Sequence, residues 1–230
     1  MANQQELDLD IYSDVVCPWC YIGQRRLEKA MTSLPNLSVR IRRRPYLLEP
    51  RVPPGGMRRS EFVAMHFGSM EAYAKRAKSM IAIAAAEGLS YRPDLIRWQP
   101  DTVNCHRLVY WAARDFEGDR SARMEWRLME LFHSEGADLR DIDVLVDAAV
   151  DCGLDASNTR DMLTSDLDVH VIKALARGGP ARGISGVPTY VFDDQFELSG
   201  ARSVEMLVAA MRRVIALREA ADGDEAPRLD

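Results

Sequence analysis

The chain has 230 residues, enough for one domain with a sizeable core or for one domain that carries an inserted one. Its formal net charge of −5 gives no indication of a nucleic-acid partner. No stretch is apolar over a membrane-spanning length, and residues 1–6 lack the basic start and apolar core of a secretory signal. We therefore expect a cytoplasmic protein that does not contact a membrane.

Two cysteines, Cys17 and Cys20, stand at the junction of a predicted strand and a predicted helix. The alternating run 7–11 predicts the strand, and residues 24–31 predict the helix. A Cys-x-x-Cys pair at such a junction is the expected arrangement of a thiol–disulfide redox centre. Pro18 suits the first turn of the helix, because its missing N–H would have no partner there.

The positions of the two cysteines predict their roles. Cys17 lies at the helix N-terminus, where free N–H groups and the helix dipole stabilise a thiolate. Cys20 lies one turn further along, on the face that leads into the core. We therefore expect Cys17 to attack a substrate disulfide and Cys20 to resolve the mixed disulfide that forms.

A zinc site and a structural disulfide are the alternative interpretations of the pair. Zinc needs a second set of ligands, but Cys105 and Cys152 are isolated and only His106 stands beside the first of them. Structural disulfides are rare in an intracellular chain. We expect no metal and no permanently bound cofactor, and we interpret Cys105 and Cys152 as small buried hydrophobes.

The order of the predicted elements is βαβ, a helical block and ββα. A second strand is expected over 37–42, a hairpin over 188–200 and a final helix from about Ser203. The helical block, with a break near Gly68 and no strand, is expected to contain helices over 61–88, 103–116, 121–134, 141–152 and 166–177.

This order predicts an α/β protein with a thioredoxin-type fold that a helical insertion interrupts. Residues 1–57 and 181–220 are assigned to the thioredoxin-like domain, 58–180 to the inserted domain, and 221–230 to a disordered tail. Both ends of the inserted block connect to the sheet near Cys17. We therefore expect the block to cover that face of the redox helix.

Several polar residues outside the pair are candidates for a role. Arg43 is expected to face inward and to reach a carboxylate, whereas its neighbours between 40 and 45 fit a solvated strand edge. Asp14 fits either a proton acceptor near the pair or a capping or exposed carboxylate. Histidine side chains in the block are interpreted as packing or surface residues, namely His66, His106, His133 and His170.

The motifs resemble those of the DsbA-like thioredoxin superfamily. Cys17-Pro18-Trp19-Cys20 follows Ser13-Asp14, and a second motif, Gly-Ile-Ser-Gly-Val-Pro-Thr, occupies 183–189. Within this superfamily the chain resembles the cytoplasmic FrnE-type branch, which is related to 2-hydroxychromene-2-carboxylate isomerases and kappa-class glutathione transferases. Runs that resemble this branch lie at 21–27, 44–50, 102–108 and 199–201. The resemblance covers residues 7–218, and Asp101 and Cys105 depart from the pattern.

The resemblance implies that Val187-Pro188 forms a cis-proline turn that faces the redox pair, with Pro188 against Cys17. The backbone of Val187 is then expected to pair with substrate, while Pro18, Trp19 and His106 line the cleft. The implied substrate is a disulfide-containing protein or a small-molecule thiol, with glutathione as reductant or substrate. The protein is expected to act as a monomer or a homodimer.

The function implied is that of a thiol–disulfide oxidoreductase with a redox-active disulfide. Trp19 is apolar where strongly oxidising relatives carry histidine, so we expect a potential nearer the reducing end. The alternative is a glutathione-dependent isomerase or transferase. Those relatives typically carry serine in place of Cys17 and do not need Cys20, so the intact pair favours the oxidoreductase.

Overall fold

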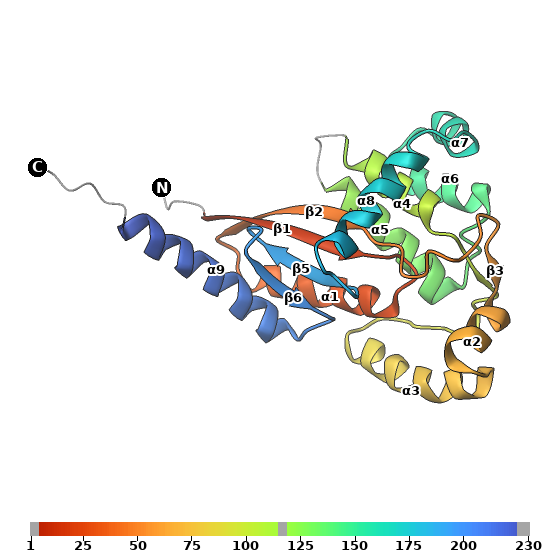
Figure 1. Cartoon of the computed structure of the whole chain (residues 1–230), viewed down its shortest axis with the longest axis horizontal. Helices are drawn as coiled ribbons and strands as arrows, with labels where there is room; N and C mark the ends of the chain where they lie inside the picture. The colour runs from red at the N-terminus through yellow and green to blue at the C-terminus, as the bar shows by residue number, and fades with distance from the viewer. Residues whose placement is uncertain (1–4, 115–118, 225–230) are drawn as a thin grey trace, which may run out of the picture.

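A four-stranded sheet forms the centre of the computed structural model, which describes residues 5–114 and 119–224. The strand order is β2-β1-β5-β6, with β2 parallel to β1 and β5 antiparallel to both of its neighbours (Figure 1). The strands are β1 (Gln5–Ser13), β2 (Leu37–Pro45), β5 (Thr189–Phe192) and β6 (Phe196–Ser199). This sheet confirms the predicted thioredoxin-type α/β fold.

Helices α1 (Pro18–Thr32) and α9 (Val204–Asp224) pack on one face of this sheet. Alternate residues of β1 face these helices, because successive side chains of a strand point to opposite faces. We call the resulting apolar cluster the sheet core. Its buried residues include Leu7, Leu9, Ile11, Leu27, Ala30, Tyr190, Phe192, Leu207, Ala210, Met211 and Val214.

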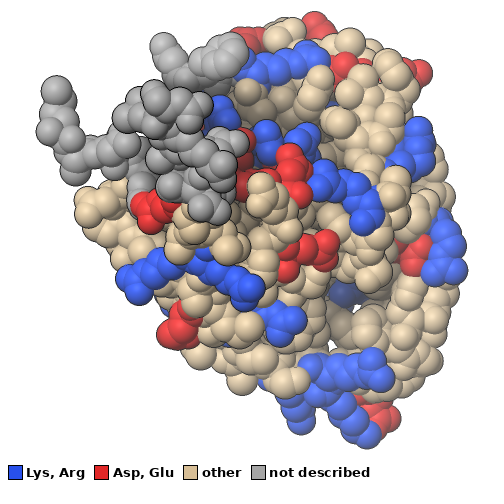
Figure 2. Space-filling model, turned by 60° about the vertical axis from the view of Figure 1, so that its left-hand side comes forward, with Lys and Arg blue, Asp and Glu red and all other residues tan. Residues whose placement is uncertain are grey.

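The opposite face of β1 carries Asp8 and Asp10, which pair with arginines of the neighbouring strand β2. The Arg40 guanidinium lies 2.7 Å from the Asp8 carboxylate, and Arg44 lies 2.8 Å from that of Asp10. Arg42 also pairs with Asp10. Acidic and basic side chains are interspersed on the face shown in Figure 2.

Helices dominate the segment between β2 and β5, as predicted. They are α2 (Arg59–Phe67), α3 (Met70–Ala86), α4 (Val103–Ala112), α5 (Arg120–Glu130), a π-helical turn η1 (Leu131–Glu135), α6 (Ile142–Asp151), α7 (Ala156–Thr164) and α8 (Val169–Ala181). The expected break falls at Gly68, whose positive φ of 81° ends α2. Cys17 and Cys20 share one buried apolar cluster with this block, as expected; we call it the site core.

The structure corrects four details of the helical block. Two short strands, β3 (Met57–Arg58) and β4 (Trp98–Gln99), pair within it although no strand was expected. Helix α7 was not predicted, because it is short and mostly polar. Helix α4 ends at Ala112, and residues 115–116 of the longer predicted helix lie outside the described residues.

Helix α8 is the fourth correction, since it continues through the Gly-Gly-Pro sequence that was read as its end. A Cβ atom on Gly179 would lie 3.0 Å from the Tyr12 ring, so glycine lets α8 approach the sheet closely. The C-terminal helix α9 includes 221–224 of the expected tail, and residues 225–230 are outside the described part.

Candidate active site

Cys17 is the N-cap residue of α1, directly after β1. Its carbonyl accepts hydrogen bonds from the N–H groups of Cys20 (3.0 Å) and Tyr21 (3.2 Å), which start the helix. Pro18 occupies the first helical position, as predicted, and no acidic residue lies in the first turn. The positive end of the helix dipole therefore acts on the Cys17 sulfur without a local negative charge on the helix.

Cys20 is buried one turn into the same helix. Burial and the neighbouring Cys17 raise the pKa of the Cys20 thiol well above its usual range. Cys20 is therefore a neutral thiol near pH 7. All four cysteines are free, so the pair is in its dithiol form.

The turn before β5 places Val187 and Pro188 against the redox pair. The Val187–Pro188 peptide bond is cis, as expected. The Cys17 thiol donates a hydrogen bond to the Val187 carbonyl, with 3.6 Å between sulfur and oxygen. Two segments separated by most of the chain thus meet at the nucleophile.

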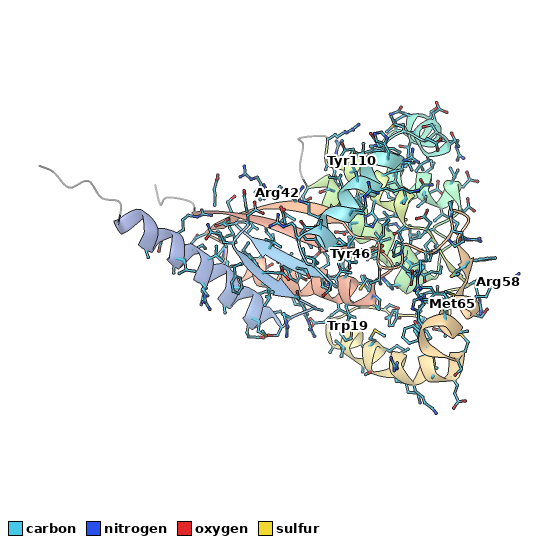
Figure 3. The ribbon with its side chains drawn as sticks, viewed as in Figure 1. Trp19, Arg42, Tyr46, Arg58, Met65 and Tyr110 are labelled. Carbon is cyan, nitrogen blue, oxygen red and sulfur yellow. The ribbon has the colours of Figure 1, made fainter. Side chains whose placement is uncertain are left out.

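Trp19 projects from the N-terminal end of α1 that lies nearest the helical block (Figure 3). Its side chain is 39% exposed, although Cys17 and Cys20 on either side of it are buried. An exposed indole beside a reactive thiol offers apolar contact area to a docking substrate.

Asp14 is buried beside the redox turn, which excludes an exposed carboxylate at this position. Its Oδ2 atom accepts hydrogen bonds from the Leu48 N–H (2.8 Å) and the Thr102 hydroxyl (3.3 Å). Its Oδ1 atom lies 3.5 Å from His106 Nε2, and neither of these two atoms has a hydrogen-bond partner. His106 is therefore a buried neighbour of Asp14.

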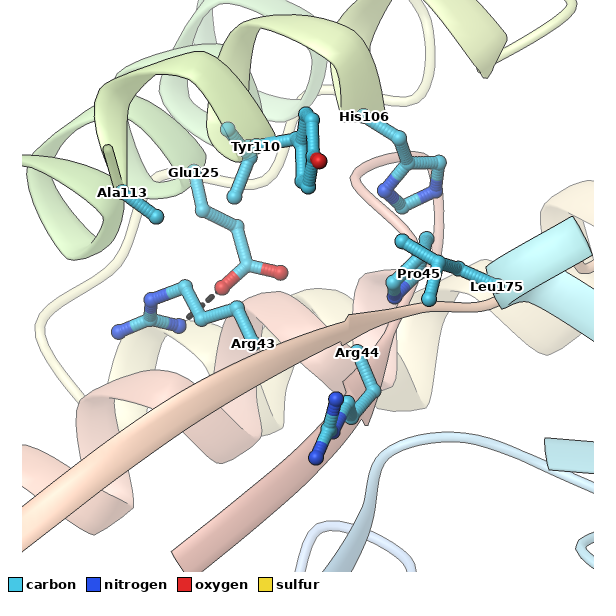
Figure 4. Close-up of a pocket in the computed structure, with 9 residues that line it drawn as sticks. Arg43, Arg44, Pro45, His106, Tyr110, Ala113, Glu125 and Leu175 are labelled. Carbon is cyan, nitrogen blue, oxygen red and sulfur yellow. Dashed lines mark hydrogen bonds and ion pairs between the residues drawn. The ribbon is translucent and has the colours of Figure 1, made fainter. Parts of the chain in front are cut away.

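A cavity of about 50 Å³ lies between α4, α5 and the end of β2 (Figure 4). His106 lines it together with Arg43 and Glu125. Arg43 is buried and pairs with the Glu125 carboxylate, which confirms the prediction that it faces inward. It also donates a hydrogen bond to the Gln24 side chain (3.2 Å), so this ion pair joins β2 to α1 and α5.

His133 is a residue of the site that the sequence did not single out. It lies in the π-helical turn η1, a type of turn found often at functional sites, and is only 1% exposed. Its ring stacks on Tyr21 with 5.2 Å between centroids. Burial, and then the charge of Arg59, lowers the pKa of His133 to about 3, so the ring is neutral near pH 7.

No group of three His, Cys, Asp or Glu side chains in residues 5–114 and 119–224 is arranged to hold a metal ion. Over the same described ranges, no helix is both long enough and apolar enough to span a membrane.

A thioredoxin-type sheet, a vicinal dithiol at a helix N-terminus and a cis-proline turn against it define a thiol-redox class of protein. The model of the DSBA-like thioredoxin domain family matches residues 8–212. The chain therefore belongs to this family, whose members include DsbA-like oxidoreductases. No curated protein sequence matches the chain.

Solved structures share this fold over nearly the whole chain. A probable DsbA oxidoreductase from Streptomyces coelicolor is 27% identical, with a TM-score of 0.81 over 97% of this chain and 93% of its own. A 2-hydroxychromene-2-carboxylate isomerase is 18% identical, with a TM-score of 0.67 over 94% and 98%.

A cytosolic disulfide reductase, DsbM from Pseudomonas aeruginosa, is 20% identical, with a TM-score of 0.60 over 91% of this chain and 99% of that one. It has also been solved with GSH. At these identities the similarity to the isomerase and the reductase shows the shared fold alone.

Proposed function

We propose that the protein is a thiol–disulfide oxidoreductase that exchanges disulfides through Cys17 and Cys20. The observation that carries this proposal is the asymmetry of the pair. Cys17 caps a helix N-terminus and contacts the Val187 carbonyl, whereas burial keeps the Cys20 thiol neutral. The Cys17 sulfur is thus positioned to attack a substrate disulfide, and the Cys20 sulfur reacts only after a mixed disulfide has formed.

The reaction begins when the Cys17 thiol loses its proton to solvent and the thiolate attacks a substrate disulfide. A Cys17–substrate disulfide forms, and the first substrate sulfur leaves as a thiolate. Cys20 then loses its proton and attacks the Cys17 sulfur, which releases the second substrate thiolate. The substrate disulfide has been reduced and the Cys17–Cys20 dithiol has been oxidised; an external dithiol restores it.

The substrate is proposed to bind across the Val187–Pro188 turn and Trp19. The Val187 carbonyl already accepts a hydrogen bond from Cys17, so its backbone is within reach of a chain bonded to that sulfur. An extended peptide could pair there by main-chain hydrogen bonds while Trp19 supplies apolar contact. Glutathione remains a proposed reductant or substrate.

We further propose membership of the FrnE-type branch and a cytoplasmic location. The sequence motifs support the branch, and the fold shared with a cytosolic disulfide reductase supports the location. The oligomeric state, a monomer or a homodimer, stays a prediction.

The test is reduction of insulin disulfides with dithiothreitol as the final reductant. Wild-type protein should accelerate the reaction, and Cys17→Ser should reduce the rate to the uncatalysed level. Cys20→Ser should accumulate a mixed disulfide that mass spectrometry detects. Cys152→Ala, which alters a buried cysteine outside the pair, is the matched control and should retain the activity.

The same variants distinguish the alternative function. A glutathione-dependent isomerase needs no resolving thiol. The oxidoreductase proposal would be refuted if isomerisation of 2-hydroxychromene-2-carboxylate survived Cys20→Ser and wild-type protein did not reduce insulin.

Limited alkylation tests the roles of the two cysteines separately. Iodoacetamide in limiting amount at pH 7 should modify Cys17 before Cys20, and the reverse order would overturn the assignment.

A further inference from the structure

A buried chain of hydrogen bonds runs from α2 toward the redox pair. Arg59 is 8% exposed and donates to the side-chain oxygen of Gln99 and to the Tyr73 hydroxyl, the latter at 2.8 Å. The Tyr73 and Tyr91 hydroxyls are 2.9 Å apart and share a hydrogen bond. Four side chains from separate segments of the helical block are therefore joined around one buried cation.

Arg59 has no carboxylate partner among the residues that the structure describes. Its guanidinium contacts a neutral amide and a neutral phenol, packs over the Phe62 ring, and leaves its Nε atom without a partner. A buried charge without an opposite charge is costly, so such groups are normally paired. The described surroundings of Arg59 thus lack a negative charge, and a thiolate that forms during the reaction would supply one.

Ring contacts lead from the end of this chain toward Cys17. The Tyr91 ring meets the His133 ring edge-on at 5.6 Å, and His133 stacks on Tyr21 at 5.2 Å. The Tyr21 N–H in turn donates a hydrogen bond to the Cys17 carbonyl at 3.2 Å. The pKa of Tyr91 is raised first by burial, then by Tyr73, and also by the charge of Cys17. These ring contacts, together with the effect of the Cys17 charge on Tyr91, connect the chain to the nucleophile.

His133 is not the cation that supports Cys17. Its pKa is about 3, because burial and the charge of Arg59 both oppose protonation. The titratable side chains around the redox turn also include Cys20 on the same helix, Asp14 just before it, and His106, which lies 3.5 Å from the Asp14 carboxylate. None of them carries the permanent positive charge of a guanidinium. Two buried guanidinium groups lie in this part of the molecule: Arg43 is paired with Glu125, whereas Arg59 bonds only neutral groups among the described residues.

We propose that Arg59 is a positioning residue whose charge, relayed through the hydroxyls of Tyr73 and Tyr91, stabilises the Cys17 thiolate. Arg59 would supply this positive charge from the inserted block, because the Trp19 side chain between the two cysteines is apolar. The inference rests on the proposed role of Cys17 as the nucleophile and gives the helical block a part in its reactivity.

The test measures the rate at which iodoacetamide alkylates Cys17 as a function of pH, in a Cys20→Ser background that leaves one reactive thiol in the pair. Arg59→Gln should move the rate profile to higher pH and slow alkylation at pH 7 by about threefold to tenfold, as expected for loss of one positive charge in a buried network. Tyr91→Phe keeps the charge but removes the last hydroxyl, and should give a smaller shift in the same direction.

Arg107→Gln is the matched control. Arg107 is a buried arginine that donates to the backbone carbonyls of Leu163 (3.3 Å) and Ser165 (2.9 Å), so its loss should destabilise the fold without moving the alkylation profile. If Arg59→Gln does not fold, the alkylation profile of Tyr91→Phe tests the proposal by itself. An unchanged profile in Tyr91→Phe and in any folded Arg59→Gln, or an equal shift in Arg107→Gln, overturns the proposal.

This assay contains no disulfide substrate. The alkylation profile can therefore be measured even if insulin reduction fails, and failure of one proposal is distinguishable from failure of the other.

Discussion

The two cores of the molecule differ in what they bury. The sheet core, between β1, β5, α1 and α9, is apolar apart from the hydroxyl of Tyr190. The site core holds Cys17 and Cys20, and His133 is packed beside them with both ring nitrogens lacking hydrogen-bond partners. Both cores thus bury a polar group without a partner, and in the site core this group lies beside the reactive cysteines.

Helix α1 belongs to both cores. Its N-terminal turns contribute Cys20, Tyr21 and Ile22 to the site core, while Leu27 and Ala30 lie in the sheet core. The sheet core can thus hold the helix rigidly while the site core sets the chemistry at its N-terminus. This division predicts that the same kind of substitution has different consequences in the two regions.

The largest expected effect is on stability, from truncation of a leucine in either core. Leu9→Ala in the sheet core and Leu128→Ala in the site core remove fully buried side chains. Each should lower the free energy of unfolding by about 2–5 kcal/mol, measured by urea denaturation. Leu9→Ala should leave the alkylation rate of Cys17 unchanged in the folded protein, whereas Leu128→Ala, on a helix that contacts α1, should change it.

Equal effects of the two substitutions on Cys17 alkylation would show that the cores are not separate. The sheet core and the site core would then behave as a single cooperative core.

A smaller effect is expected where the cores meet, at Gly23 on α1. A Cβ atom at this position would lie 2.5 Å from the Tyr190 hydroxyl oxygen and 3.0 Å from Pro188 Cγ. Gly23→Ala should therefore destabilise the protein by about 1–3 kcal/mol through overpacking and slow disulfide exchange by displacing Pro188.

Tyr190→Phe removes the hydroxyl that this methyl group would meet. The hydroxyl is buried without a partner, so its removal alone should cost little stability. In the double variant Gly23→Ala/Tyr190→Phe, stability should recover further than activity, because the clash with Pro188 remains. Full recovery of both would indicate that Pro188 adjusts freely.

The sequence predicted the parts of the fold whose signals are local. Alternation revealed β1 and β2, and the spacing of Cys17 and Cys20 at a strand–helix junction revealed the redox pair. The cis bond before Pro188 followed only from the family resemblance, because residues around a proline do not themselves favour cis over trans.

The features that were missed depend on tertiary contacts. Strands β3 and β4 are too short to show a periodic pattern, and the pairing between them is non-local. The Gly-Gly-Pro sequence in α8 was read as a stop, but Gly179 is helical because α8 packs against Tyr12. The burial of His133 and Arg59 likewise arises from helices distant in sequence, so no local pattern marks them.

The remaining expected effect is a dependence of stability on pH that arises from His133. Burial, and then the charge of Arg59, lowers its pKa from 6.5 to about 3 in the folded state. Between these pH values the unfolded chain binds a proton that the native state does not. The stability contributed by neutral His133 is therefore complete above about pH 6.5 and is lost as the pH falls toward about 3, by up to about 1.4 kcal/mol per pH unit.

The His133→Phe variant removes this titration while keeping a ring against Tyr21, so its unfolding free energy should fall less steeply with decreasing pH than that of the wild type. His170→Phe, at an exposed position, is the matched control and should follow the wild-type curve. Urea titrations at half-unit intervals from pH 7 to pH 4 measure the difference. Parallel curves for His133→Phe and the wild type would mean that His133 binds a proton in the native state, and the site core would then contain a second cation beside Arg59.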